Sequence, residues 1–142
     1  MIVKNILLGR RGNVVTIEPT ADLAAAVKLL AERRVGAVVI VGADHRIVGI
    51  LSERDIVRAL AEQGPTALNE PVGQVMTRDV KTCCEDDTIE SLMGRMTTGK
   101  FRHMPVEEQG KLVGIVSIGD AVKNRVEEIE REAAALRDYI RQ

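Results

Sequence analysis

Residues 47–55 read Ile-Val-Gly-Ile-Leu-Ser-Glu-Arg-Asp, and residues 112–120 read Leu-Val-Gly-Ile-Val-Ser-Ile-Gly-Asp. Each stretch is a short apolar run with a glycine inside it, followed by Ser-x-x-Asp. The two matching glycines lie 65 positions apart. A short apolar run predicts a buried strand, and Ser-x-x-Asp is typical of the first turn of a helix. The chain is therefore expected to contain the same strand-to-helix unit twice.

The predicted elements around these stretches are repeated in the same order. Strand, helix, strand and strand are predicted at residues 14–17, 21–34, 37–41 and 47–51, and a helix follows to about residue 63. The second series is predicted at residues 80–84, 88–100, 104–106 and 112–116. Such an internal repeat indicates two copies of one structural unit. We predict an α/β fold with two β-α-β-β-α repeats, at residues 1–66 and 67–125, and a helical extension at residues 126–142.

The last segment, residues 120–142, contains neither glycine nor proline. Its apolar residues recur three or four positions apart: Val122, Val126, Ile129, Ala133, Leu136 and Ile140. This spacing predicts one long amphipathic helix. Its apolar stripe is expected to cover either the sheet of the chain itself or a partner subunit.

The composition argues against several classes of protein. The chain has 142 residues, a net charge of −1 and only 1% aromatic residues. A balanced charge provides no basic field for nucleic acid or an anionic membrane, and the few aromatic residues argue against single-stranded nucleic-acid binding. No apolar run approaches the ~20 residues of a membrane span. No signal peptide is evident, so a cytoplasmic location is expected.

The two cysteines, Cys83 and Cys84, are adjacent. They cannot form a disulfide framework, and no nearby ligand pattern makes them a zinc site. Ordinary reduced cysteines are the simpler interpretation, and a redox role is the alternative.

The duplicated motifs resemble those of the CBS (cystathionine β-synthase) domain family. The resemblance rests on residues 14–17, 36–40 and 47–55 in the first copy and residues 75–77, 102–106 and 112–120 in the second. It implies a tandem CBS pair, often called a Bateman module, with pseudo-twofold symmetry. It also implies adenosine-nucleotide binding in clefts between the halves, and pairing of two chains into a disc-shaped homodimer.

The resemblance implies roles for particular residues. In the family, the Asp holds the ribose hydroxyls, the Ser contacts phosphate, and backbone near the early Thr and the apolar-Pro strand frames adenine. By position, the first site would use Thr16, Ala37, Val38, Ser52 and Asp55, with Arg54 beside them. The second site would use Thr82, His103, Met104, Pro105, Ser117 and Asp120.

The two sets of residues are not equivalent. The first lacks the Arg-x-x-Pro pattern present at residues 102–105, and the second has Ile118-Gly119 in place of Glu53-Arg54. If only one site is occupied, we expect it to be the second.

Each of these residues also has a plainer interpretation. Each Ser can cap its helix, with the Asp placed favourably in the first turn. His103 can line a nucleotide cleft or simply pack, and no partner in sequence reach supports a catalytic or metal role. Arg54 can reach a phosphate or pair with a neighbouring acid. Solvent exposure or phosphate contact is expected of Arg10, Arg11, Lys100 and Arg102.

The leading functional expectation is a non-catalytic regulatory module that binds AMP, ADP, ATP or an NAD-like nucleotide. It would signal energy or redox state to an unidentified protein target, with no catalytic cofactor and no metal. The alternative is a dimeric interaction scaffold with empty nucleotide sites, joined through the tail helix. An enzyme is the third hypothesis, and it lacks a recognisable nucleophile–base pair or metal-ligand set.

Overall fold

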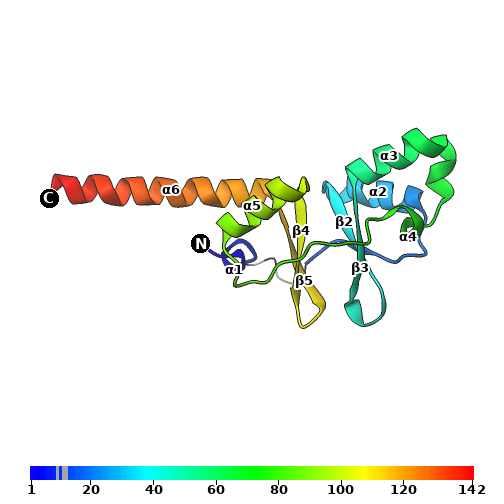
Figure 1. The fold of residues 1–142 in the computed structure, drawn as a ribbon, viewed down its shortest axis with the longest axis horizontal. Coiled ribbons are helices and arrows are strands. Elements are labelled where there is room, and N and C mark those ends of the chain that lie inside the picture. The colour runs from blue at the N-terminus through cyan, green and yellow to red at the C-terminus, as the bar shows by residue number, and fades with distance from the viewer. Residues whose placement is uncertain (9, 11–12) are drawn as a thin grey trace.

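The computed structural model describes residues 1–8, 10 and 13–142. The chain forms two similar halves that lie side by side (Figure 1). In the first half, β1 pairs in parallel with β2, and β2 pairs antiparallel with β3 across the short 3-10 turn η1. Its elements are β1 (Thr16–Ile17), α2 (Leu23–Arg33), β2 (Ala37–Val41), η1 (Ala43–His45), β3 (Ile47–Ser52) and α3 (Glu53–Gln63).

The second half repeats this order around an antiparallel pair of strands. Its elements are α5 (Ile89–Gly99), β4 (His103–Glu108), β5 (Lys111–Ser117) and α6 (Ile118–Arg141). The 3-10 segment η2 (Gly64–Asn69) and the single-turn helix α4 (Val72–Val75) connect the halves. The predicted α/β architecture of two repeats and a long C-terminal helix is therefore confirmed.

One predicted strand, at residues 80–84, is reduced to a single parallel bridge between Cys83 and Val106. Pro105 explains the difference. In the first half, the N–H of Val39 donates to the carbonyl of Val15 and extends the parallel ladder. Pro105 stands at the position of Val39, and proline has no N–H to donate. The parallel pairing of the second half therefore stops after one bridge.

The first helix of each repeat packs against the opposite half (Figure 1). Helix α1 (Val3–Ile6) buries Val3 in the core cluster that contains Ile89, Leu92 and Met104. Helix α4 instead buries Val72 in the cluster of the first half. The predicted repeats are continuous segments of the chain. The two hydrophobic cores are not, because each contains one helical turn from the other repeat.

The repeated glycine of the motif makes this exchange possible. A Cβ added to Gly114 would lie 2.8 Å from Cδ2 of Leu7, and a Cβ added to Gly49 would collide with the side chain of Met76. Leu7 and Met76 follow α1 and α4, the helices that cross to the opposite half. A side chain at either glycine would force the crossing segment outward, because protein interiors are close-packed.

Helix α6 projects from the second half well beyond the body, and the C-terminus lies at its free end, away from the first half (Figure 1). Its 24 residues give a length of about 36 Å at 1.5 Å per residue. Within residues 1–8, 10 and 13–142, no helix combines the length and apolarity needed to cross a membrane.

Candidate functional site

Two clefts lie where the two halves meet, and we name each after its aspartate. The Asp55 cleft has a volume of about 350 Å³ and the Asp120 cleft about 370 Å³. Both volumes fall within the ~300–1,000 Å³ range of small-molecule pockets. Residues 52–55, 58, 77, 79–81 and 99–103 supply most of the Asp55 cleft. Residues 10, 13–15, 34–37, 115, 117 and 120 supply most of the Asp120 cleft.

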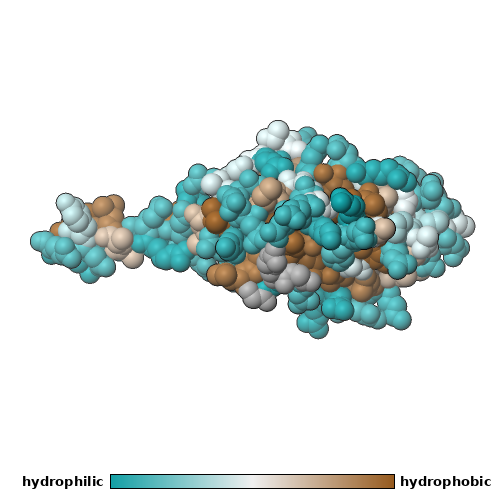
Figure 2. Space-filling view, turned by 90° about the horizontal axis from the view of Figure 1, so that it is seen from below, coloured by the Kyte–Doolittle hydropathy of each residue, from teal (hydrophilic) through white to brown (hydrophobic). Residues whose placement is uncertain are grey.

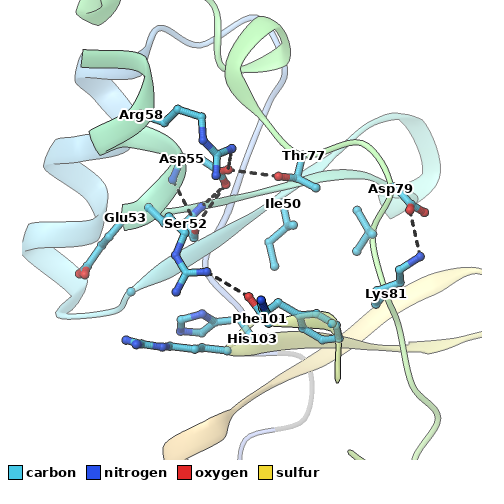
Figure 3. Close-up of a pocket in the computed structure, with 16 residues that line it drawn as sticks. Ile50, Ser52, Glu53, Asp55, Arg58, Thr77, Asp79, Lys81, Phe101 and His103 are labelled. Carbon is cyan, nitrogen blue, oxygen red and sulfur yellow. Dashed lines mark hydrogen bonds and ion pairs between the residues drawn. The ribbon is translucent and has the colours of Figure 1, made fainter. Parts of the chain in front are cut away.

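The Asp55 carboxylate is buried, with 8% of the residue exposed. Its Oδ2 accepts hydrogen bonds from the N–H of Ser52 at 2.9 Å and from Ser52 Oγ at 3.1 Å. Its Oδ1 accepts from Thr77 Oγ1 at 3.2 Å and lies 3.6 Å from the guanidinium of Arg58. Figure 3 shows Asp55 between Thr77 and Arg58. Both carboxylate oxygens therefore already have partners within the chain.

Asp120 has the same cap but, among the described residues, fewer additional partners. Its Oδ2 accepts from the N–H of Ser117 at 3.0 Å and from Arg10 at 3.4 Å, and 30% of its side chain is exposed. Burial alone would raise the pKa of Asp120, but the hydrogen bonds from Ser117 and the charge of Arg10 outweigh burial and lower it. Asp120 is therefore ionised at neutral pH, and the hydrogen bonds described for it all use one oxygen.

Both serines cap their helices, as the plainer interpretation predicted. The N–H groups of Asp55 and Asp120 donate to Ser52 Oγ and Ser117 Oγ at 3.4 and 3.1 Å, which completes a capping box at the start of α3 and α6. The first N–H of each helix is also used, because Glu53 donates to the carbonyl of Gly36 at 3.1 Å and Ile118 to that of Arg102 at 2.8 Å. A cap does not exclude a ligand, because the partial positive charge of the helix start remains.

The structure brings residues of the two predicted sets together. Ser52 and Asp55 share a cleft with His103, and Ser117 and Asp120 share a cleft with both Ala37 and His103. Each cleft therefore combines the Ser-x-x-Asp of one repeat with strand residues of the other. Of the predicted second set, His103, Ser117 and Asp120 line the Asp120 cleft together, and their action as one site stays a prediction.

Several predicted residues lie behind the clefts rather than in them. Val38 and Met104 are fully buried, and Pro105 is buried beside Met104 on β4. Thr82 donates from Oγ1 to Glu107 at 3.2 Å. Thr16 lies on β1, half-buried. None of these five residues lines either cleft, so the roles that the resemblance implied for them stay predictions.

Arg54 lines the Asp55 cleft, and its contact with a phosphate stays a prediction. Its guanidinium donates to the carbonyl of Lys100 at 3.0 Å. Lys100 is the left-handed C-cap of α5, so Arg54 supplies a donor at the end of that helix and links the two repeats. Its equivalent in the second repeat is Gly119, which has no side chain, so the Asp120 cleft lacks this link.

His103 lies between the clefts and lines both. Its ring faces Gly36, where an added Cβ would lie 3.2 Å from Cε1. Burial lowers the pKa of His103, and this effect exceeds the opposite influence of Glu53 and Asp120. The ring is therefore neutral at pH 7. Figure 3 shows it beside Phe101 at the wall of the Asp55 cleft.

Sequence reasoning missed four side chains that shape the Asp55 cleft: Thr77, Arg58, Lys81 and Phe101. Arg58 was detectable, because it stands one turn after Asp55. Thr77 and Lys81 come from the start of the second repeat, and nothing local in the sequence indicates that this segment crosses to Asp55. Of the basic residues expected near the clefts, Arg10, Lys100 and Arg102 line them. Arg11 lies outside the described residues.

The cysteines and the acidic residues do not form a second site. Burial, reinforced by Asp87, raises the pKa of Cys83 to about 12, so this thiol is protonated and unreactive at neutral pH. Among the residues that the structure describes, no group of histidine, cysteine and acidic side chains is arranged to hold a metal ion.

The comparison with protein families decides the assignment. The CBS domain family matches residues 3–62 and 72–127. The chain belongs to the CBS domain family. CBS domains are non-catalytic modules, which confirms the expectation that this pair is not an enzyme. The chain spans 66% and 58% of the length of two curated relatives that it matches.

Solved structures support the same assignment. The CBS-domain containing protein ATU1752 from Agrobacterium tumefaciens is 44% identical, with a TM-score of 0.84 over 88% of this chain and 99% of its own. A CBS domain protein from Pyrobaculum aerophilum, complexed with AMP, is 30% identical, with a TM-score of 0.75 over 84% and 89% of the two chains. The CBS pair of MJ0100, in complex with 5-methylthioadenosine and S-adenosyl-L-methionine, is 26% identical, with a TM-score of 0.80 over 90% and 98%.

Proposed function

We propose that this CBS pair is a regulatory module that binds an adenosine nucleotide in the clefts between its repeats. The observation that carries the proposal is the presence of two clefts, each with an aspartate held at a helix N-terminus and basic side chains opposite it. The AMP and S-adenosyl-L-methionine complexes of two relatives support the same ligand class.

The chemistry of the clefts suits the parts of such a ligand. A carboxylate accepts two hydrogen bonds, which matches the vicinal hydroxyls of ribose. Lys100 and Arg102 line the Asp55 cleft and can attract phosphate. The N-termini of α3 and α6 add partial positive charge near the aspartates. Since Gly36 and His103 line both clefts, a ligand in one cleft would alter the wall of the other.

Binding would act by population shift. A ligand that contacts both repeats favours the arrangement of the halves in which both sets of contacts form. We propose that a protein target reads this arrangement and thereby senses energy or redox state. We also retain a homodimer and a cytoplasmic location as parts of the proposal.

Calorimetry with AMP, ATP, NADH and S-adenosyl-L-methionine tests the proposal. Asp120→Asn removes the charge that would receive the ribose diol, so we expect at least about a tenfold loss of affinity in that cleft. Asp55→Asn should do the same in the other cleft. Asp22→Asn is the matched control, because Asp22 caps α2 through the N–H of Ala25 at 2.8 Å outside both clefts.

Absence of binding by the wild-type chain at millimolar concentrations of all four ligands would overturn the proposal. It would favour the scaffold hypothesis, in which the clefts stay empty and the chain acts through its dimer surface.

A further inference from the structure

Helix α6 carries an apolar seam that the chain itself leaves exposed. Among the described residues, six of the nine exposed large apolar side chains belong to this helix. Leu136 is 60% exposed and Ile140 is 73% exposed. Figure 2 shows apolar side chains on the projecting end of the helix. We name as the α6 seam the residues Val122, Val126, Ile129, Ala133, Leu136 and Ile140.

The seam does not face the body. Helix α6 meets the body through Ala121, which is buried, and through Arg125 and Glu128, which pair with Glu90 and with the N-terminus. At 3.6 residues per turn, the seam lies roughly 90° around the helix from this line. The surface next to the seam is therefore open to a partner along the whole helix.

The spacing of the seam is that of a coiled coil. Its six residues follow one another at intervals of four, three, four, three and four. This is an uninterrupted heptad pattern, with Val126, Ala133 and Ile140 at a and the other three at d. The a positions hold Val126, Ala133 and Ile140 and the d positions hold Val122, Ile129 and Leu136, so the number of strands is left to the flanking charges. The partner that this pattern fits is another helix with the same repeat.

The charges beside the seam identify that partner as a second copy in parallel. In a parallel coiled coil, each g residue faces the e residue of the next heptad on the other helix. Arg125 would then face Glu130, and Glu132 would face Arg137, twice each by symmetry. Both pairs have opposite signs. Arg125 already pairs with Glu90 and Glu128, so Glu132–Arg137 is the cleaner of the two.

An antiparallel arrangement of the same six layers is disfavoured. There, e faces e and g faces g. Glu130 would face its own copy, Glu132 would face its own copy, and Lys123 would face Arg137. All three contacts are between like charges.

We infer that two copies of this chain associate through a parallel, in-register coiled coil of α6. This inference assigns a surface to the proposed homodimer, and it does not depend on nucleotide binding. Because the seam spans fewer than three heptads, the dimer should dissociate measurably on dilution.

Sedimentation equilibrium of the full chain without nucleotide tests the seam. Leu136→Glu places a charge in the seam and should weaken the dimer by more than about a hundredfold. Ala135→Glu is the matched control, because it introduces the same charge at an exposed neighbouring position off the seam, and it should leave the dimer within about twofold of wild type. A monomeric wild type, a trimer, or equal behaviour of the two variants would overturn the inference.

A charge exchange tests the orientation. Glu132→Arg and Arg137→Glu should each weaken the dimer about tenfold, because each variant replaces two attractive pairs by repulsive ones. The double variant should return to within about threefold of wild type. A double variant weaker than either single variant would contradict the parallel pairing.

Cross-linking tests the register. In a chain whose exposed Cys84 has been replaced by serine, Ala133→Cys should form a covalent dimer with diamide, because the two introduced thiols share one layer. Ala135→Cys should not. Equal cross-linking of both variants would contradict the inferred register. A dimer that passes these tests while calorimetry shows no nucleotide binding would support the surface and reject only the proposed ligand.

Discussion

The two clefts are built from the same motif, yet they hold their aspartates differently. Asp55 is buried and has Thr77 and Arg58 on the oxygen that its cap does not use. Asp120 is more exposed, and its described partners share one oxygen. Among the described residues, five basic side chains line the Asp55 cleft and two line the Asp120 cleft.

This difference separates two requirements of a nucleotide site. A diol needs a carboxylate with a free oxygen, and a phosphate chain needs nearby positive charge. Among the described residues, the second oxygen of the Asp120 carboxylate has no partner, which meets the first requirement, whereas Asp55 must exchange Thr77 or Arg58 for the ligand. The Asp55 cleft meets the second requirement better. We therefore expect the clefts to prefer ligands with different numbers of phosphates.

The largest expected effect is on discrimination between ATP and AMP in the Asp55 cleft. Combined substitution of Lys100→Gln and Arg102→Gln removes two of its basic side chains. We expect the affinity for ATP to fall about thirtyfold and that for AMP only about threefold, because the extra phosphates of ATP lose their counter-charges. Calorimetry in an Asp120→Asn background isolates this cleft.

Arg34→Gln provides the comparison, because Arg34 lines the Asp120 cleft. It should leave the ATP-to-AMP ratio of the Asp55 cleft unchanged. Equal losses for the two nucleotides in the double variant would mean that Lys100 and Arg102 do not face the phosphates.

The next effect is on stability. Asp55→Ala should lower the free energy of unfolding by about 2–3 kcal/mol, because it removes a cap and leaves the Thr77 hydroxyl without its acceptor in a half-buried site. Asp120→Ala should cost only about 1 kcal/mol, the usual value of a helix cap, because no described partner beyond Arg10 and the cap is lost. Urea unfolding measures both.

Ser52→Ala and Ser117→Ala calibrate this comparison. Each serine accepts the same hydrogen bond from the third residue of its helix, so each substitution should cost about 1 kcal/mol. If the two aspartate variants were also equal, the partners of Asp55 beyond its cap would contribute nothing to stability.

The sequence sufficed to predict the fold because the motif is duplicated with its spacing. The Gly-x-x-Ser-x-x-Asp stretches mark a strand and a helix start in both repeats, and the capping boxes confirm both helix starts. Pro105 was visible in the sequence, but its effect on the strand at residues 80–84 depends on which strand lies beside it. Local pattern does not specify that neighbour.

The composition of each cleft could not be predicted for a related reason. Thr77 reaches Asp55 because the segment after α4 crosses to the first half and pairs with Ile50 on β3. The closest sequence signal is Gly49, whose missing side chain leaves space for Met76. A glycine in a strand indicates close approach of another group, but it does not identify the group.

The smallest expected effect concerns His103, the residue that the clefts share. Its folded-state pKa lies below the ordinary value of about 6.5, so the unfolded chain binds more protons as the pH falls through this range. Stability should therefore be unaffected by His103 above about pH 7.5 and should decline below about pH 6.5, by at most about 1.4 kcal/mol per pH unit. His103→Gln should remove this component, seen as the difference between the urea unfolding curves of the two proteins at pH 7.5 and pH 5.5.

An anion in either cleft favours the protonated ring, so AMP binding at pH 6 should take up protons in the wild type and fewer in the variant. If the stability of the two proteins depended on pH in the same way, the pKa of His103 would be the same in the folded and the unfolded chain.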